Sequence, residues 1–251
     1  MATGTINFSS DALSGAATFS IILPDPDRVG PGPYPVLLQL HGRSDDHRAW
    51  LEKSMLWGYV EPLPLIVVMP SGHNFWWSNL YPERGVRYED LLVQDLWEHV
   101  QAMYPARPGR WAIGGLSMGG FGAIRLGLKY PEKFCSIYAH SSAIPDQDTL
   151  ANWFAGATPT VLSDLDCYAW AEQRTVADLP RLGFDCGTED HLIKQNRAFH
   201  SHLEALGLPH VYAEYPGGHT WPYWDLHVQE ALIQHCAVLG IAPVPPEPAP
   251  E

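Results

Sequence analysis

One serine of this chain lies in a run of glycines, in the stretch GGLSMGGFG at residues 114–122. Gly115 and Gly119 stand two positions before and two positions after Ser117, which gives the pattern G-x-S-x-G. In this pattern the serine sits on a sharp, strained turn from a strand into a helix, where the two flanking positions come so close together that both should lack side chains. The hydroxyl then projects clear of the sheet, so Ser117 is a candidate nucleophile.

The surroundings of Ser117 favour this interpretation over a glycine-rich turn that only packs a helix on a strand. The stretch RWAIGG at residues 110–115 predicts a short strand, and residues 121–130 predict a helix that stops before Pro131. The first turn of that helix would direct free N–H groups and the positive end of its dipole at the site. A developing oxyanion would be stabilised there.

A serine alone is a weak nucleophile, so a base and an acid that orients the base are needed. In this kind of turn they follow in the chain order Ser, Asp or Glu, His. Asp190, in the stretch DCGTEDHL, comes after a predicted strand and before a predicted helix, at the sheet edge where such folds place their sites. The adjacent Glu189 stays an alternative, whereas Asp185 falls within the apolar run and should point elsewhere.

His219, in the stretch YPGGHTW, is the candidate base because it follows another predicted strand and two glycines that allow a loop to reach the site. The chain has 12 histidines, so eleven others are possible candidates for the base. His41 precedes the serine, which is the wrong chain order, so we expect a structural role for it. Two pairs lie on predicted helices, where surface positions would explain them: His200 with His202, and His227 with His235.

The elements that must position these residues alternate between short apolar runs and helix-length amphipathic runs, which is typical of strands joined through helices in a largely parallel sheet. The stretches INFSS and TFSIILP near the start predict an antiparallel pair. Further strands are expected at residues 35–40, 63–70, 110–115, 134–142, 181–187 and 210–218, and longer helices at 88–104, 121–130, 191–206 and 221–239. We therefore expect an α/β fold with helices on both faces of the sheet.

The length of 251 residues, with 46% hydrophobic residues, fits one α/β domain, which we place at residues 1–241. Short helical pieces at about residues 141–179 predict a small insertion above the sheet. The proline-rich stretch APVPPEPAPE at residues 242–251 predicts a disordered tail.

The net charge of −13 and the scattered basic residues disfavour nucleic acid as a partner. The first residues lack a basic start and an apolar core, and no run approaches the ~18 apolar residues of a membrane span. We therefore expect a soluble, cytoplasmic protein with no membrane partner. The four cysteines show no CxxC spacing, which indicates buried thiols and no metal site.

Six stretches of the chain resemble the esterase D and tributyrin esterase group of α/β-hydrolases, which is related to small feruloyl esterases and mycolyltransferases. They occur in the family's order and rough spacing, and they are LHGRSDDHRAW, VVMPSG, YEDLLVQDLWEHVQAMYP, AIGGLSMGGFGAIRLGLKYPEKF, CGTEDHL and GGHTWPYW. The resemblance covers most of the chain and implies an α/β-hydrolase fold.

The resemblance also implies roles for individual residues. Ser117 corresponds to the nucleophile, Asp190 to the acid and His219 to the base. The backbone N–H groups of Met118 and Arg43 correspond to the oxyanion donors. Because arginine is bulky at that position, Ser44 or a shifted loop remains an alternative to Arg43. The stretch HGRSD stands where S-formylglutathione hydrolases carry a cysteine-containing loop, which argues against formylglutathione chemistry.

We predict a serine carboxylesterase that hydrolyses short-chain acyl or aryl esters through an acyl-enzyme, with a small-molecule ester as partner and no metal or organic cofactor. Aromatic residues in loops or helix starts near the same edge of the sheet predict a substrate site, and they are Trp50, Trp76, Trp77, Trp221 and Trp224. The alternatives are an acyltransferase, a feruloyl or acetyl-xylan-type esterase, and a non-catalytic binding protein on the same fold. The physiological ester and the oligomeric state, a homo-oligomer included, stay open.

Overall fold

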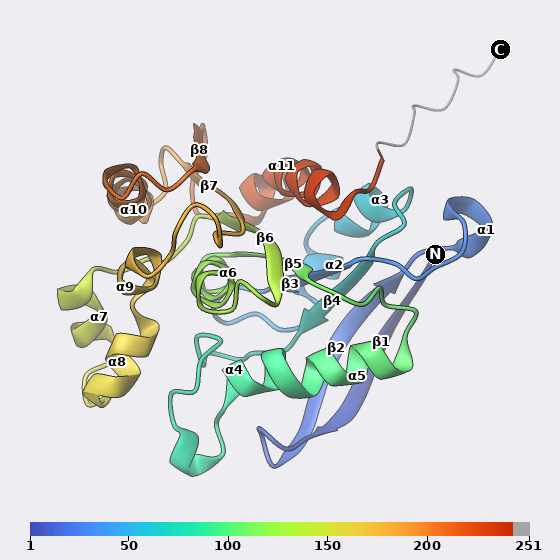
Figure 1. Cartoon of the computed structure of the whole chain (residues 1–251), viewed down its shortest axis with the longest axis horizontal. Helices are drawn as coiled ribbons and strands as arrows, with labels where there is room; N and C mark the ends of the chain where they lie inside the picture. The colour runs from blue at the N-terminus through green and yellow to red at the C-terminus, as the bar shows by residue number, and fades with distance from the viewer. Residues whose placement is uncertain (243–251) are drawn as a thin grey trace.

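A computed structural model describes residues 1–242 of the chain (Figure 1). Eight strands form one sheet in the order β1-β2-β4-β3-β5-β6-β7-β8. The strands are β1 (Ala2–Ser10), β2 (Gly15–Leu23), β3 (Val36–Leu40), β4 (Ile66–Pro70), β5 (Trp111–Leu116), β6 (Phe134–His140), β7 (Arg181–Gly187) and β8 (His210–Tyr215). All but the first position of the predicted tail at 242–251 lies outside the described residues.

The sheet is mostly parallel, as predicted. Strands β3 to β8 pair in parallel, whereas β1 pairs with β2 and β2 with β4 in antiparallel fashion. The predicted antiparallel pair at the start of the chain is thus confirmed. Because the parallel strands all end at one edge, the loops that follow β3, β5, β7 and β8 meet there.

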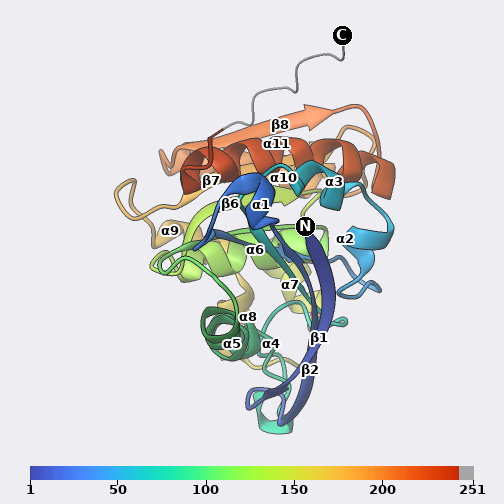
Figure 2. The same cartoon turned by 90° about the vertical axis from the view of Figure 1, so that its right-hand side faces the viewer.

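Helices cover both faces of the sheet, and Figure 2 shows α11 and α3 on one side with α4 and α5 on the other. Neighbouring side chains of a buried strand point to opposite faces, so Leu38 joins the core under α5 and α6 while Leu37 joins the core under α11. Besides η1 (Pro82–Arg84) and the short α1 (Pro26–Val29), α2 (Ala49–Glu52) and α3 (Leu56–Val60), the chain forms α4 (Tyr88–Asp90), η2 (Leu91–Leu96), α5 (Trp97–Met103), α6 (Met118–Lys129), α7 (Gln147–Trp153), α8 (Pro159–Leu165), α9 (Cys167–Glu172), α10 (Ile193–Ala205) and α11 (Trp221–Leu239). Within the described residues, no helix has the length and apolar character that a membrane crossing needs.

The helix predicted at residues 88–104 is interrupted by η2, a π-helical segment. Leu91, Leu92 and Val93 are consecutive and all buried, which a regular α-helix with one apolar stripe does not achieve. The π-helical hydrogen bonds reach one residue further along the chain and change the side-chain directions at this point. The prediction had the extent of the helix right and its type wrong over these six residues.

Helices α7, α8 and α9 lie between β6 and β7, and a buried charge cluster ties them to the body of the fold. The guanidinium of Arg125 on α6 is fully buried. It lies 2.6 Å from a carboxylate oxygen of Glu89 on α4 and 2.8 Å from one of Asp164 on α8, and it also donates to the carbonyl oxygen of Trp77. Burial alone would raise the pKa of Glu89, but the charge of Arg125 and a hydrogen bond from Lys129 lower it well below its usual range.

Candidate active site

Ser117 lies between β5 and α6 with a backbone φ of 54° and ψ of −116°. A Cβ added to Gly115 would lie 2.6 Å from the carbonyl group of Gly119, and one added to Gly119 would lie 2.5 Å from the carbonyl oxygen of Leu40. Real Cβ atoms do not approach backbone so closely, so both positions require glycine. The turn therefore has the strained geometry that the sequence pattern predicts.

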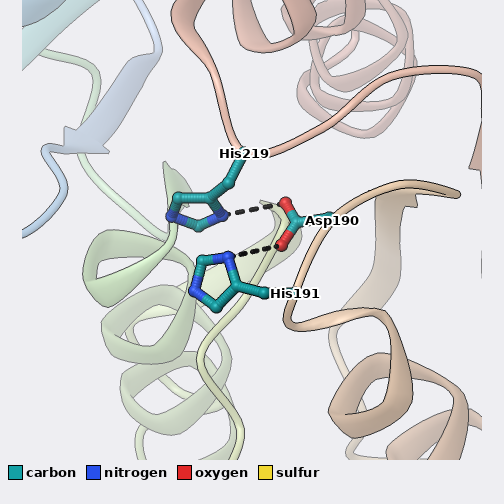
Figure 3. Close-up of side chains that lie close together, drawn as sticks. All are labelled: Asp190, His191 and His219. Atoms are coloured by element: carbon teal, nitrogen blue, oxygen red, sulfur yellow. Dashed lines mark hydrogen bonds and ion pairs between the residues drawn. The ribbon is translucent and has the colours of Figure 1, made fainter.

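The structure brings the three predicted triad residues together. The Nε2 atom of His219 lies 3.0 Å from the hydroxyl oxygen of Ser117, and its Nδ1 atom lies 2.8 Å from Oδ2 of Asp190. Asp190 follows β7, and His219 follows β8 just before α11, so three strand ends supply the three side chains. Figure 3 shows the imidazole of His219 turned towards the carboxylate of Asp190.

The carboxylate of Asp190 is held in its ionised form. Burial by itself would raise the pKa of Asp190, but hydrogen bonds from His219 and from the backbone N–H of Leu192 lower it below its usual value. An ionised carboxylate only accepts hydrogen bonds, so Nδ1 of His219 must carry the proton that it donates. The Nε2 atom is then left to accept the proton of the Ser117 hydroxyl.

The rival acids lie elsewhere. Glu189 is exposed, and the carboxylate that contacts His219 is that of Asp190. Asp185 points away from the site, where it pairs with His140 at 2.7 Å and accepts a hydrogen bond from the Tyr223 hydroxyl at 2.8 Å.

His41 is buried below the loop that follows β3 and has the structural role expected from the sequence. The backbone N–H of Gly72 donates to its Nε2 atom at 2.9 Å, so its Nδ1–H donates to the carbonyl oxygen of Gly42 at 2.7 Å. The prediction of surface positions for His227 and His235 is wrong. A spacing of eight residues puts both on one face of α11, and the structure turns that face to the sheet, where His235 contacts the Ser136 hydroxyl.

The loop after β3 and the start of α6 carry the two predicted oxyanion donors. The N–H of Met118 belongs to the first turn of α6, where helical N–H groups have no partner within the helix. In the described part of the chain, no acceptor is found for the N–H of Arg43. The N–H of Ser44, the alternative donor, already donates to the side-chain oxygen of Asn74 at 2.7 Å. These contacts favour Arg43 over Ser44 as the second donor.

A cavity of about 730 Å³ opens over Ser117. Three of the five predicted substrate-binding residues line it, namely Trp76, Trp221 and Trp224. The ring of Trp224 meets the imidazole of His219 edge to face, with ring centroids 4.9 Å apart.

The prediction that Trp50 and Trp77 bind substrate is wrong, because both rings are buried beneath the site. Trp50 is 1% exposed, and its ring N–H donates to the carbonyl oxygen of Leu40. Trp77 is fully buried and packs against Gly122 of α6. Both residues lie near the predicted edge, but position in the chain does not say whether a side chain points into the cleft or under it.

Sequence reasoning missed several residues that line the cavity, among them Asn74, Trp153 and His191. Trp153 ends α7 and reaches the cavity, with its ring 5.5 Å from that of Trp76. Its place in the insertion predicted above the sheet was the one feature of the sequence that could have indicated a position near the cavity. His191 directly follows Asp190, which could have marked it as a neighbour of the site.

Figure 3 shows His191 beside the carboxylate of Asp190 and the ring of His219. Its Nδ1 atom lies 3.5 Å from Oδ1 of Asp190, and the two imidazole centroids are 4.6 Å apart. One donor atom from each of these three residues lies within 4.8 Å of the others, a set that a metal such as Zn²⁺ accepts. A metal bound there would compete with the hydrogen bond between Asp190 and His219, so the arrangement suits a triad better than a metal centre.

Comparisons with known proteins agree with this geometry. The family described as "Putative esterase" matches residues 10–235 of the chain. The acetyl esterase of Caldicellulosiruptor saccharolyticus is 30% identical over 259 residues, which cover 92% of this chain and 97% of that protein.

Two solved structures share the fold over nearly the whole chain. A ferulic acid esterase is 25% identical with a TM-score of 0.82, and the match covers 95% of this chain and 98% of that one. The S-formylglutathione hydrolase from Staphylococcus aureus is 24% identical with a TM-score of 0.81 and a coverage of 92% and 97%. This chain therefore belongs to the "Putative esterase" family of α/β-hydrolases, in the esterase D group related to feruloyl esterases and mycolyltransferases, and it is a serine hydrolase that cleaves carboxylic esters.

Proposed function

We propose that this esterase hydrolyses short-chain acyl and aryl esters through an acyl-enzyme formed on Ser117. The observation that carries the proposal is the chain of hydrogen bonds from Asp190 through His219 to Ser117, which ends in a cavity walled by tryptophan rings. Relatives named as an acetyl esterase and a ferulic acid esterase support both parts of the substrate class.

The geometry assigns one task to each group. The Nε2 atom of His219 takes the proton of the Ser117 hydroxyl as the oxygen attacks the ester carbonyl, and Asp190 stabilises the imidazolium that forms. The N–H groups of Met118 and Arg43 stabilise the oxyanion of the tetrahedral intermediate. His219 then protonates the departing alcohol, and a water activated by the same imidazole releases the acid and restores the Ser117 hydroxyl.

The cavity walls support the limit on acyl length. Trp76 and Trp153, the last residue of α7, both line the cavity, and their rings contact each other with centroids 5.5 Å apart. Flat rings offer stacking faces to an aryl group. A long alkyl chain gains ~0.8 kcal/mol for each methylene that it buries, and rings that close the cleft deny it that gain.

A fluorophosphonate probe tests the catalytic assignment, since it labels only an activated serine. We expect labelling at Ser117 and burst release of p-nitrophenol from p-nitrophenyl acetate, both absent in Ser117→Ala with its fold intact. Labelling at another serine would contradict the assignment. Product analysis with an added alcohol separates hydrolysis from acyl transfer: we expect the free acid to dominate, and a dominant transfer product would make the enzyme an acyltransferase.

A further inference from the structure

The cavity over Ser117 has an unusual charge for this chain. The protein carries a net charge of −13, yet only two side chains in the cavity lining, apart from the histidines, are ionisable, and they are Arg43 and Asp45. Asp45 forms an ion pair with Lys53 and is therefore neutralised. Arg43 is exposed, and within the described residues no carboxylate pairs with it. The ionised Asp190 lies behind His219 and outside the lining, so the one unpaired permanent charge among the side chains that line the cavity is positive.

The position of Arg43 places this charge next to the chemistry. Arg43 follows Gly42 in the loop after β3, and both residues line the same cavity as Ser117. Its backbone N–H is the proposed oxyanion donor, so the Cα that carries its side chain is one bond from the nitrogen that binds the reacting carbonyl oxygen. A second group on the substrate, a few bonds away from the ester, would lie within its reach.

A guanidinium recognises one chemical class especially well. It is always ionised, and its planar set of donors matches the two oxygens of a carboxylate. Once a substrate fills the cavity, its tryptophan rings, among them Trp76 and Trp221, would help to exclude water and so strengthen an ion pair formed there. The overall negative charge of the protein repels anions, so a local cation is needed to admit one.

We propose that the Arg43 side chain binds a carboxylate of the substrate, which makes the preferred substrates monoanionic esters. The inference deepens the proposed function and rests on it. The carboxylate can belong to the acyl part or to the alcohol part of the ester, and the chemistry at Arg43 is the same in both cases. A hydrogen-bonded charge pair is worth ~1.5–3 kcal/mol, which corresponds to a preference of about 10-fold to 100-fold.

Two matched pairs of esters test the proposal at about pH 8, where imidazoles are ordinarily neutral. The pair 4-acetoxybenzoate and its methyl ester places the carboxylate on the alcohol side. The pair mono-p-nitrophenyl adipate and its methyl ester places it on the acyl side. We expect kcat/KM to favour the anion by at least about tenfold in one pair, and the preference to fall at high salt.

Each variant is judged by the ratio of kcat/KM for the anionic ester to kcat/KM for its neutral methyl ester. A change in the oxyanion site affects both esters and therefore cancels in this ratio. Arg43→Gln should reduce the preference for the anion about tenfold or more, while Arg43→Lys should keep part of it. Arg84→Gln is the matched control, because it removes the same charge from an exposed position in η1. It should leave the preference unchanged.

Fluorophosphonate labelling of Ser117 confirms that each variant is folded and active before the ratios are compared. Equal rates for anionic and neutral esters in the parent enzyme, or an unchanged preference in Arg43→Gln, would overturn the role of Arg43 while neutral esters are still cleaved. If neither member of either pair is cleaved, the proposed function itself fails.

Discussion

The backbone N–H of Ser44 donates a 2.7 Å hydrogen bond to the side-chain oxygen of Asn74. Ser44 follows β3 and Asn74 follows β4, so this bond joins two neighbouring loops at the carboxyl edge of the sheet. It holds Ser44 in a left-handed conformation with φ of 68°. The N–H of the preceding Arg43 is thereby kept at the mouth of the cavity.

Loss of this bond should impair the oxyanion site. We expect Asn74→Ala to lower kcat about tenfold with a smaller change in KM, because a loosened donor weakens the transition state more than the bound ester. Asn74→Asp keeps an acceptor oxygen in the same place and serves as the control. Steady-state kinetics on p-nitrophenyl acetate make the comparison. Parent-like kcat in Asn74→Ala would show that the loop holds its position without the bond.

Substitutions of the two adjacent carboxylates, Asp190 and Glu189, should differ sharply in their effect on kcat. Asp190→Asn should reduce kcat by about 10⁴, because the amide favours the wrong tautomer of His219 and does not stabilise its cation. Glu189→Gln removes a charge one residue away and should stay within about threefold of the parent enzyme. If the two variants lose activity equally, the acid has been misassigned.

Acyl length should be limited by the ring of Trp153. In a series of p-nitrophenyl esters we expect kcat/KM to peak at acetate or butyrate and to fall towards palmitate. Trp153→Ala should raise the relative rate on octanoate, by up to about fourfold for each methylene that the enlarged cavity can bury. Trp57→Ala, at a partly exposed tryptophan of α3 outside the cavity lining, is the control. A steady rise towards palmitate in the parent enzyme would instead indicate a lipase-like groove.

The stability of the fold should fall as the medium becomes mildly acidic, in part through His41. Burial lowers the pKa of His41 to about 4, against 6.5 for an ordinary histidine. Between these values the unfolded chain binds the proton and the folded chain does not, so stability is fully present above pH 6.5 and is lost as pH falls towards 4. From about pH 7.5 to about pH 5 this amounts to roughly 2 kcal/mol of unfolding free energy.

Denaturant unfolding at those two pH values measures the loss. His41→Gln, which keeps a hydrogen-bonding side chain without a titratable group, should show a smaller difference between the two pH values by about that amount. An identical pH difference in His41→Gln would assign the acid sensitivity to other groups, such as the buried His235, whose pKa burial also lowers, to about 3.

Local chemistry explains which parts of the site were predictable. Gly115 and Gly119 reveal Ser117 because only that backbone geometry demands glycine at both places. Asp190 and His219 follow from their places at strand ends, since a parallel sheet brings such ends to one edge. The extent of α11 is likewise the predicted one, because its apolar pattern is uninterrupted.

The direction of a side chain was not predictable in the same way. Trp76 and Trp77 are neighbours with φ of 54° and 55°, yet one lines the cavity and the other fills the core. Trp153 enters the site from the segment between β6 and β7, and no local pattern reports how such a segment folds back over a sheet. Both outcomes depend on contacts between residues far apart in the chain.

The charge cluster around Arg125 has a consequence for how the enzyme meets its substrate. Arg125 forms an ion pair with the side chain of Asp164 on α8. The backbone carbonyl oxygen of Asp164 accepts a hydrogen bond from the ring N–H of Trp170 on α9. Both helices are therefore linked through Asp164 to the centre of the molecule. Moving α8 away from the centre would leave the buried cation without Asp164 as a partner, which is costly. Because α8 follows α7, whose last residue Trp153 lines the cavity, we expect this anchor to hold the wall at Trp153 in place before an ester arrives.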